Sequence, residues 1–175
     1  MKVAEGDFHL AMVRAADRRG VERTIDFLAT IFGVASNEGV AAKAMTMDVA
    51  GANIQVLNPV HLLCSKVANL SLPGRGGPMD VEQARVAVRV LSSFAEAVAK
   101  SDTRRGRAIA KRVLQLAKSP AGWVARERYG VDAFESIQAW ECMDRDFREN
   151  YFPRVRGKLD AEFARRQVHQ GRHRD

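Results

Sequence analysis

The feature that most constrains the fold is a series of apolar residues spaced three and four apart, which begins at Pro59 and continues for most of the chain. Val60, Leu63 and Val67 show this spacing, and a stripe from Val81 to Val98 continues it over about five turns. A helix with one apolar face has to pack that face against other elements. The pattern therefore predicts amphipathic helices that pack together from Pro59 onward.

Capping and helix-breaking residues divide this region into about five helices. The first opens at Pro59 and the second near Asp80, after a glycine-rich loop at 71–78 that cannot be helical. Further caps and breakers follow at Ser101 or Asp102, and at Ser119, Gly130, Asp132 and Pro153. The last helix, after Pro153, is expected to be exposed.

The residues before Pro59 show the alternation and the turn chemistry of two β-hairpins. The first is predicted from strands at 8–16 and 21–27, and the second from strands at 44–49 and 53–57. We expect an α+β fold that is mostly α, with a small antiparallel sheet of about four strands from the two hairpins and a bundle of about five helices. The expected divisions are a β-sheet subdomain at 1–58, a helical subdomain packed on it at 59–153, and a basic C-terminal helix or tail at 154–175.

Composition excludes several classes of protein. A chain of 175 residues with 46% apolar content can bury one core, and no apolar run approaches the roughly 20 residues that span a bilayer. Cys64 and Cys142 lie far apart without neighbouring Cys or His at metal-ligand spacing, so reduced thiols in a cytoplasmic protein are expected. No membrane partner is expected.

Basic residues are concentrated in one segment. Nine lysines and arginines lie between Lys100 and Arg128 against two acids, an excess equal to the whole net charge of +7. A second basic cluster follows at 154–174. Such surfaces attract polyanions through phosphate contacts and counterion release. The alternative is that these cations form an ordinary solvated helical face.

Three segments in the same order resemble bacterial nucleotidyltransferase-like proteins. Residues 23–28 resemble the strand with the third metal-binding carboxylate, 56–69 the strand and helix after it, and 119–137 the helical region that follows in some uncharacterised members. The resemblance covers most of 7–153. It implies the latter portion of such a domain, without the Gly-Gly turn and the paired aspartates, which would lie upstream of Met1.

The resemblance also implies roles for individual residues. Asp26 matches the third carboxylate by position, and a complete set of carboxylates would hold two Mg²⁺ ions. Lys66 resembles a basic residue that can approach substrate phosphates, and Arg75 lies in the adjoining glycine-rich loop. An ordinary exposed helix lysine is the alternative for Lys66. No metal site is expected unless another chain completes it around Asp26.

Two acidic pairs imitate the missing motif. Asp80 and Glu82 follow Gly76-Gly77, but Pro78 intervenes and the acids open a helix, so capping explains them better. Asp144 and Asp146 have the right spacing, yet no glycine turn precedes them, and we interpret them as solvated surface acids.

Basic and aromatic residues form the predicted binding set. Most aromatics of the last third should pack the helices together, whereas Tyr151 beside arginines could stack on single-stranded nucleic acid or anchor a protein interface. The residues predicted to contact phosphate, nucleic acid or a partner are Lys66, Arg75, Arg104, Arg105, Arg107, Lys111, Arg112, Arg148, Tyr151 and Arg154.

The favoured functional hypothesis is a catalytically incomplete nucleotidyltransferase-like protein that needs no cofactor and binds nucleic acid, or a nucleoprotein complex, through its basic helices. Size and charge would suit a mobile-element inhibitor of a host defence complex. The alternative is a toxin-like, Mg²⁺-dependent nucleotidyltransferase completed by a partner chain or an upstream segment. A homodimer or a tight protein partner is a third possibility, because open sheet edges must be paired or covered.

Overall fold

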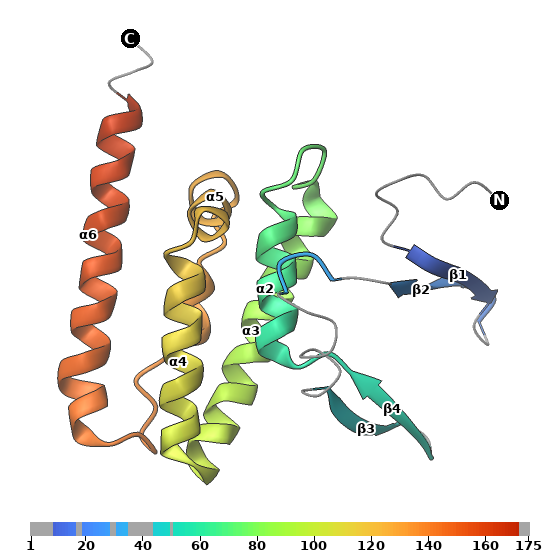
Figure 1. Cartoon of the computed structure of the whole chain (residues 1–175), viewed down its shortest axis with the longest axis horizontal. Coiled ribbons are helices and arrows are strands. Elements are labelled where there is room, and N and C mark those ends of the chain that lie inside the picture. Colours follow the sequence, from blue (N-terminus) through green and yellow to red (C-terminus); the bar gives the residue numbers. More distant parts are fainter. Residues whose placement is uncertain (1–8, 17–18, 29–30, 35–43, 50, 172–175) are drawn as a thin grey trace.

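The computed structural model describes residues 9–16, 19–28, 31–34, 44–49 and 51–171. The chain is mostly helical, as predicted, with the strands before Pro59 and the helices after it (Figure 1). The strands are β1 (His9–Ala16), β2 (Glu22–Leu28), β3 (Met45–Val49) and β4 (Ala52–Val56). The α-helices are α2 (Pro59–Asn69), α3 (Pro78–Ser101), α4 (Thr103–Ala117), α5 (Pro120–Tyr129) and α6 (Phe152–Gly171), with a 3-10 turn at Ala133–Ser136 and a π-helical turn at Phe147–Tyr151. Within the described residues, no helix combines the length and the apolar character that a membrane span requires.

The predicted sheet of about four strands is wrong. In the described part of the chain, β1 pairs antiparallel with β2 and β3 with β4, and the two pairs form separate two-stranded sheets. In the second hairpin, Gly51 has a φ of 83°, which suits glycine, and its N–H donates to Asp48 over 3.1 Å. Alternation within a strand fixes its own hairpin but does not specify pairing between hairpins.

Both faces of the second hairpin remain accessible. Met47 and Ile54 oppose each other across β3 and β4 and are 48% and 44% exposed. Thr46 and Gln55, the neighbouring pair, are also exposed. Because this face of the hairpin is not packed against apolar residues, it contributes little burial that would stabilise a larger sheet on the helices. Figure 1 shows both hairpins at one side of the helical region.

The hydrophobic core lies among the helices. Leu63 of α2 and Leu91 of α3 are almost completely buried, as the three-and-four spacing predicts, and Val113 of α4 is buried with them. Burying each such side chain contributes about 1.5–3 kcal/mol. Small residues bring α3 and α4 close together, since a Cβ atom at Gly106 would lie only 2.7 Å from the Cβ of Ala99.

Side-chain caps begin several helices. Asn58 accepts the Val60 N–H at 3.0 Å, Asp102 accepts the Arg104 N–H at 2.9 Å, and Ser119 accepts the Gly122 N–H at 3.1 Å. Gly130 ends α5 with a left-handed φ of 63°. These caps lie at or beside the predicted helix boundaries.

The segment predicted as a basic C-terminal helix or tail forms most of α6 and is held to the rest of the helical region. Leu159 is 1% exposed, and the Phe163 ring stacks on Trp123 of α5 with a centroid distance of 6.4 Å. The Arg166 guanidinium group lies over the Trp123 ring, 4.5 Å from the ring centroid. Part of the C-terminal positive charge therefore supports the fold.

Candidate functional site

A basic face runs along α4 and continues past its end. Arg104, Lys111 and Lys118 recur every seven residues, so they fall on one side of the helix. Arg105 and Arg112 form a second row beside them. All five residues are exposed, and we call them the α4 basic face.

The five side chains of the α4 basic face form no ion pair with any described acidic residue. Other basic residues in the helical region are neutralised internally, as Arg126 and Arg156 are by Asp132 and Asp160. The α4 basic face therefore combines exposure with uncompensated charge, which is the electrostatic requirement for attracting a polyanion.

Arg107 was predicted as a binding residue and lies on α4, yet it is used within the protein. Its guanidinium donates to both carboxylate oxygens of Asp144, at 3.0 Å from Nε to Oδ2 and 2.5 Å from Nη2 to Oδ1. Its charge also lies 5.7 Å from the centroid of the Phe147 ring. The Arg107 hydrogen bond and the Phe147 backbone N–H hold the pKa of Asp144 below its usual value.

The ion pairs with Arg107 give the two acidic residues Asp144 and Asp146 a structural role. Asp144 accepts the Phe147 N–H at 3.0 Å and thereby caps the turn that leads into α6. Asp146 lies 3.7 Å from Arg107. These acids tie α4 to the last part of the chain, so the interpretation of both as merely solvated is incomplete.

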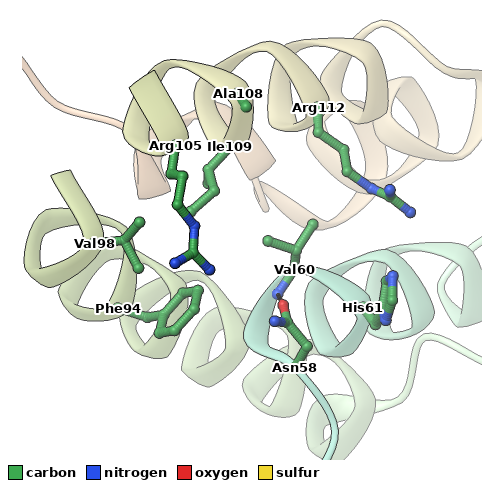
Figure 2. Close-up of a pocket in the computed structure, with 9 residues that line it drawn as sticks. All are labelled: Asn58, Val60, His61, Phe94, Val98, Arg105, Ala108, Ile109 and Arg112. Carbon is green, nitrogen blue, oxygen red and sulfur yellow. Dashed lines mark hydrogen bonds between the residues drawn. The ribbon is translucent and has the colours of Figure 1, made fainter. Parts of the chain in front are cut away.

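A pocket adjoins the α4 basic face (Figure 2). Its volume is about 290 Å³, and α2, α3 and α4 all contribute to its walls. Figure 2 shows Phe94 and Val98 on α3 opposite Arg105 of α4, with Asn58 and Val60 at the start of α2. The remaining lining residues are His61, Ala108, Ile109 and Arg112. Arg105 and Arg112 therefore belong to both the α4 basic face and the pocket.

Arg112 lies beside α2 as well. Burial raises the pKa of the Cys64 thiol, and the charge and hydrogen bond of Arg112 offset only part of that rise. This pairing positions the Arg112 side chain at the side of the pocket where His61 lies (Figure 2).

Lys66 and Arg75 lie apart from the α4 basic face and contact the start of α3. The Lys66 ammonium donates to Gln83 at 2.7 Å. Arg75 lies 3.9 Å from Asp80, whose carboxylate accepts the Gly76 N–H at 3.2 Å. The α3 helix begins at Pro78, two residues before the predicted start near Asp80. Asp80 therefore lies within the first turn of the helix, and its carboxylate stabilises the preceding glycine-rich loop.

The candidate metal ligand Asp26 lies in β2, opposite Met12 of β1. Its side chain is outside the described part of the structure. Among the described residues, no group of three or more His, Cys, Asp or Glu side chains is placed to hold a metal ion. The two Mg²⁺ ions implied by the resemblance stay a prediction.

The remaining predicted contacts lie near the π-helical turn. The Tyr151 ring stacks on Phe147, with centroids 5.4 Å apart, so it packs within the protein. Arg148 is half-buried, and its Nε atom has no hydrogen-bond partner among the described residues. Arg154 is exposed on α6. The structure thus brings four of the ten predicted contacts together, namely Arg104, Arg105, Lys111 and Arg112.

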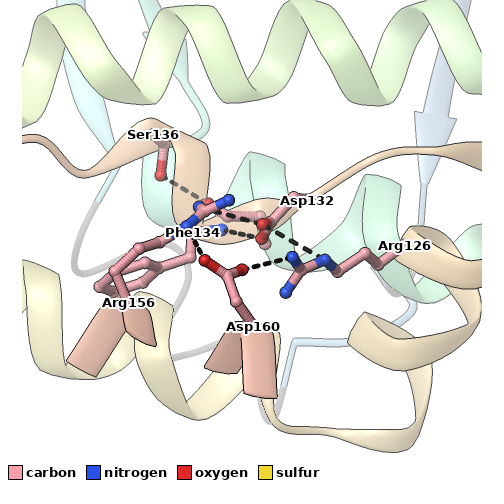
Figure 3. Close-up of polar contacts among 7 residues, drawn as sticks. Arg126, Asp132, Phe134, Ser136, Arg156 and Asp160 are labelled. Atoms are coloured by element: carbon pink, nitrogen blue, oxygen red, sulfur yellow. Dashed lines mark hydrogen bonds and ion pairs between the residues drawn. The ribbon is translucent and has the colours of Figure 1, made fainter. Parts of the chain in front are cut away.

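An ionic cluster centred on the buried Asp132 joins α5 to α6 (Figure 3). Asp132 is 5% exposed, and its Oδ2 atom lies 3.5 Å from Arg126 and 3.1 Å from Arg156. These contacts are electrostatic, since Oδ2 has no hydrogen bond of good geometry with the described residues. Asp160 accepts from Arg126 at 2.6 Å. Burial opposes ionisation of Asp160, but the two arginines outweigh it and lower its pKa.

The sequence interpretation did not identify the pocket or the ionic cluster. Phe94 lies three residues after Leu91 and four before Val98, so the sequence places it beside the apolar stripe, but this spacing does not reveal the space next to the ring. Arg156 and Asp160 show the four-residue spacing of a helical ion pair, but their partners on α5 are distant in sequence.

Comparisons with known proteins found no matching family model, no similar curated protein and no similar solved structure. The resemblance to nucleotidyltransferase-like proteins therefore remains a prediction from the sequence. The geometry of the α4 basic face and the adjoining pocket has to support any functional proposal by itself.

Proposed function

We propose that this protein binds nucleic acid through the α4 basic face. The observation that carries the proposal is the group of exposed cations on one helix that have no ion pair with the described acidic residues. A phosphate chain presents negative charge at regular intervals and releases counterions when lysines and arginines replace them. A helix with two rows of cations suits such a ligand.

The internal use of other arginines supports this proposal. Arg107, Arg126 and Arg156 are held by carboxylates, so their charge is compensated where they lie. The cations of the α4 basic face contribute long-range attraction instead, because no described acid neutralises them. Binding is expected to be independent of sequence and sensitive to salt.

The test compares two variants that remove the same charge. One carries Arg104→Gln, Lys111→Gln and Lys118→Gln on the α4 basic face. The matched control carries Arg128→Gln, Lys158→Gln and Arg165→Gln at exposed positions on α5 and α6. The two residues that also line the pocket are left unchanged.

Fluorescence anisotropy with labelled DNA and RNA oligonucleotides measures the affinity of each protein. The α4 variant should bind about tenfold or more weakly than the control, because lost phosphate contacts lower affinity beyond a general charge effect. Equal affinity of the two variants, or no binding by the unmodified protein at low salt, would overturn the proposal. A role as an inhibitor of a nucleoprotein complex would use the same face, so this measurement comes before any test of that role.

A further inference from the structure

We infer that the pocket beside the α4 basic face captures one unpaired nucleobase, so that the protein prefers single strands to duplexes. The inference rests on the proposed function and adds a ligand class to it. Arg105 and Arg112 link the two features, because each belongs to the α4 basic face and to the pocket wall. A strand that follows the cations of α4 must therefore pass the pocket opening.

The spacing along α4 places an apolar centre between two cations. Arg105 and Arg112 are seven residues apart, which corresponds to about 10 Å of helix rise. Ile109 lies between them in the sequence and also lines the pocket. This order suits a nucleotide unit, in which an apolar base face lies between flanking phosphates.

The opposite wall offers a surface for the base. Phe94 and Val98 come from α3, and the half-buried Phe94 ring faces the space between the helices (Figure 2). Aromatic rings stack on bases regardless of base identity, and this interaction is available to unpaired bases. In a duplex, each base is already stacked and paired and cannot enter without being extruded.

Polar groups at the start of α2 could orient the base. The Asn58 side chain lines the pocket, and its Oδ1 atom accepts the Val60 N–H at 3.0 Å. Its Nδ2 group retains donors for an acceptor on a base edge. The volume of about 290 Å³ lies at the small end of ligand pockets, which favours one base over a stacked pair.

The positive charge of the pocket wall favours a nucleotide over a neutral apolar ligand. A neutral ligand would remove water from around Arg105 and Arg112 without offering a counter-charge, and neither residue pairs with an acid in the described part of the chain. A nucleotide in a strand provides the base for the apolar wall and phosphates for the guanidinium groups.

The test uses three ligands of equal length with the unmodified protein: oligo(dT), an abasic strand with the same phosphates, and a duplex. Anisotropy at one salt concentration should show oligo(dT) binding about fivefold or more tightly than the abasic strand, from a single stacked base. It should also bind more tightly than the duplex at equal phosphate concentration. This comparison needs no variant and cannot be confused with misfolding.

A pair of variants then locates the base. Phe94→Leu keeps an apolar side chain and removes the ring, and it should abolish the preference for oligo(dT) over the abasic strand while duplex affinity stays unchanged. The matched control Phe163→Leu changes a half-buried ring on α6 and should keep the preference.

The outcomes separate the two proposals. Equal binding of oligo(dT) and the abasic strand, or a preference that survives Phe94→Leu, would overturn base capture while leaving the proposed function intact. Failure to bind all three ligands would overturn both.

Discussion

Replacing Asp132 by Asn should destabilise the protein more than any exposed ion pair could. Asp132 is 5% exposed and lies within 3.5 Å of Arg126 and 3.1 Å of Arg156. Asn has nearly the same shape and can still accept the Phe134 N–H, which the Asp132 carboxylate now accepts at 2.9 Å. The change therefore removes the charge while retaining the cap.

The magnitude follows from the two cations left behind. Breaking a buried ion pair by removing one partner costs about 3–5 kcal/mol, because the remaining charge is uncompensated. Asp160 still contacts both arginines, so the lower value, about 3 kcal/mol, applies here. For a chain of this size, that loss lowers Tm by about 6–12 °C. Asp132→Ala should lose about 1 kcal/mol more, since the cap is also removed.

Urea denaturation followed by circular dichroism at 222 nm measures the free energy of unfolding. Glu149→Gln is the matched control, because Glu149 pairs with Arg145 four residues away and both side chains are more than half exposed, at 54% and 83%. That change should cost no more than about 0.5 kcal/mol. The reasoning fails if Asp132→Asn costs as little as Glu149→Gln, or if Asp132→Ala and Asp132→Asn are equally stable.

Two further predictions concern acid stability and glycine. Asp144 and Asp160 have pKa values lowered by their arginine partners, so their stabilisation is complete above the unfolded-state pKa near 3.9 and is lost as pH falls through the folded-state values. Tm should stay nearly constant from about pH 7 to 5 and fall below about pH 4. Asp144→Asn should make this fall in Tm less steep. If the variant shows the same fall in Tm below about pH 4 as the unmodified protein, the Asp144 carboxylate does not contribute to it. Gly122→Ala should destabilise, because its Cβ would lie 2.2 Å from the Leu116 carbonyl oxygen, whereas Gly157→Ala in open space on α6 should stabilise by about 0.5–1 kcal/mol. Urea midpoints compare the two glycine variants, and shifts of the same sign would contradict the packing argument.

Local features of the sequence predicted the helices well. The three-and-four spacing of Leu63 and Leu91 identifies their buried faces, and Asp102 and Ser119, which lie at predicted helix boundaries, occupy N-cap positions. Each of these signals acts within a few residues, where periodicity and capping chemistry are decisive. The arrangement of the hairpins was not predictable in this way, because pairing between hairpins depends on contacts that no local pattern specifies.

In the candidate site, too, features that depend on nearby residues were predictable, whereas contacts between distant segments were not. Arg104 and Lys111 are seven residues apart in one helix, so their common side follows from local geometry alone. The engagement of Arg107 could not be predicted, since Asp144 is 37 residues away in sequence. The pocket likewise depends on how α2, α3 and α4 pack, and Phe94 alone gives no indication of the space beside it.

The salt dependence of single-strand binding measures how many cations of the α4 basic face contact phosphates. If all five cations of the α4 basic face contact phosphates, the logarithm of the affinity should fall with the logarithm of salt concentration with a slope of about −3.5. Arg104→Gln with Lys111→Gln should reduce the magnitude of that slope by about 1.4. An affinity that does not change between about 50 and 200 mM salt, or a slope that the double variant leaves unaltered, would show that the α4 basic face does not bind phosphates.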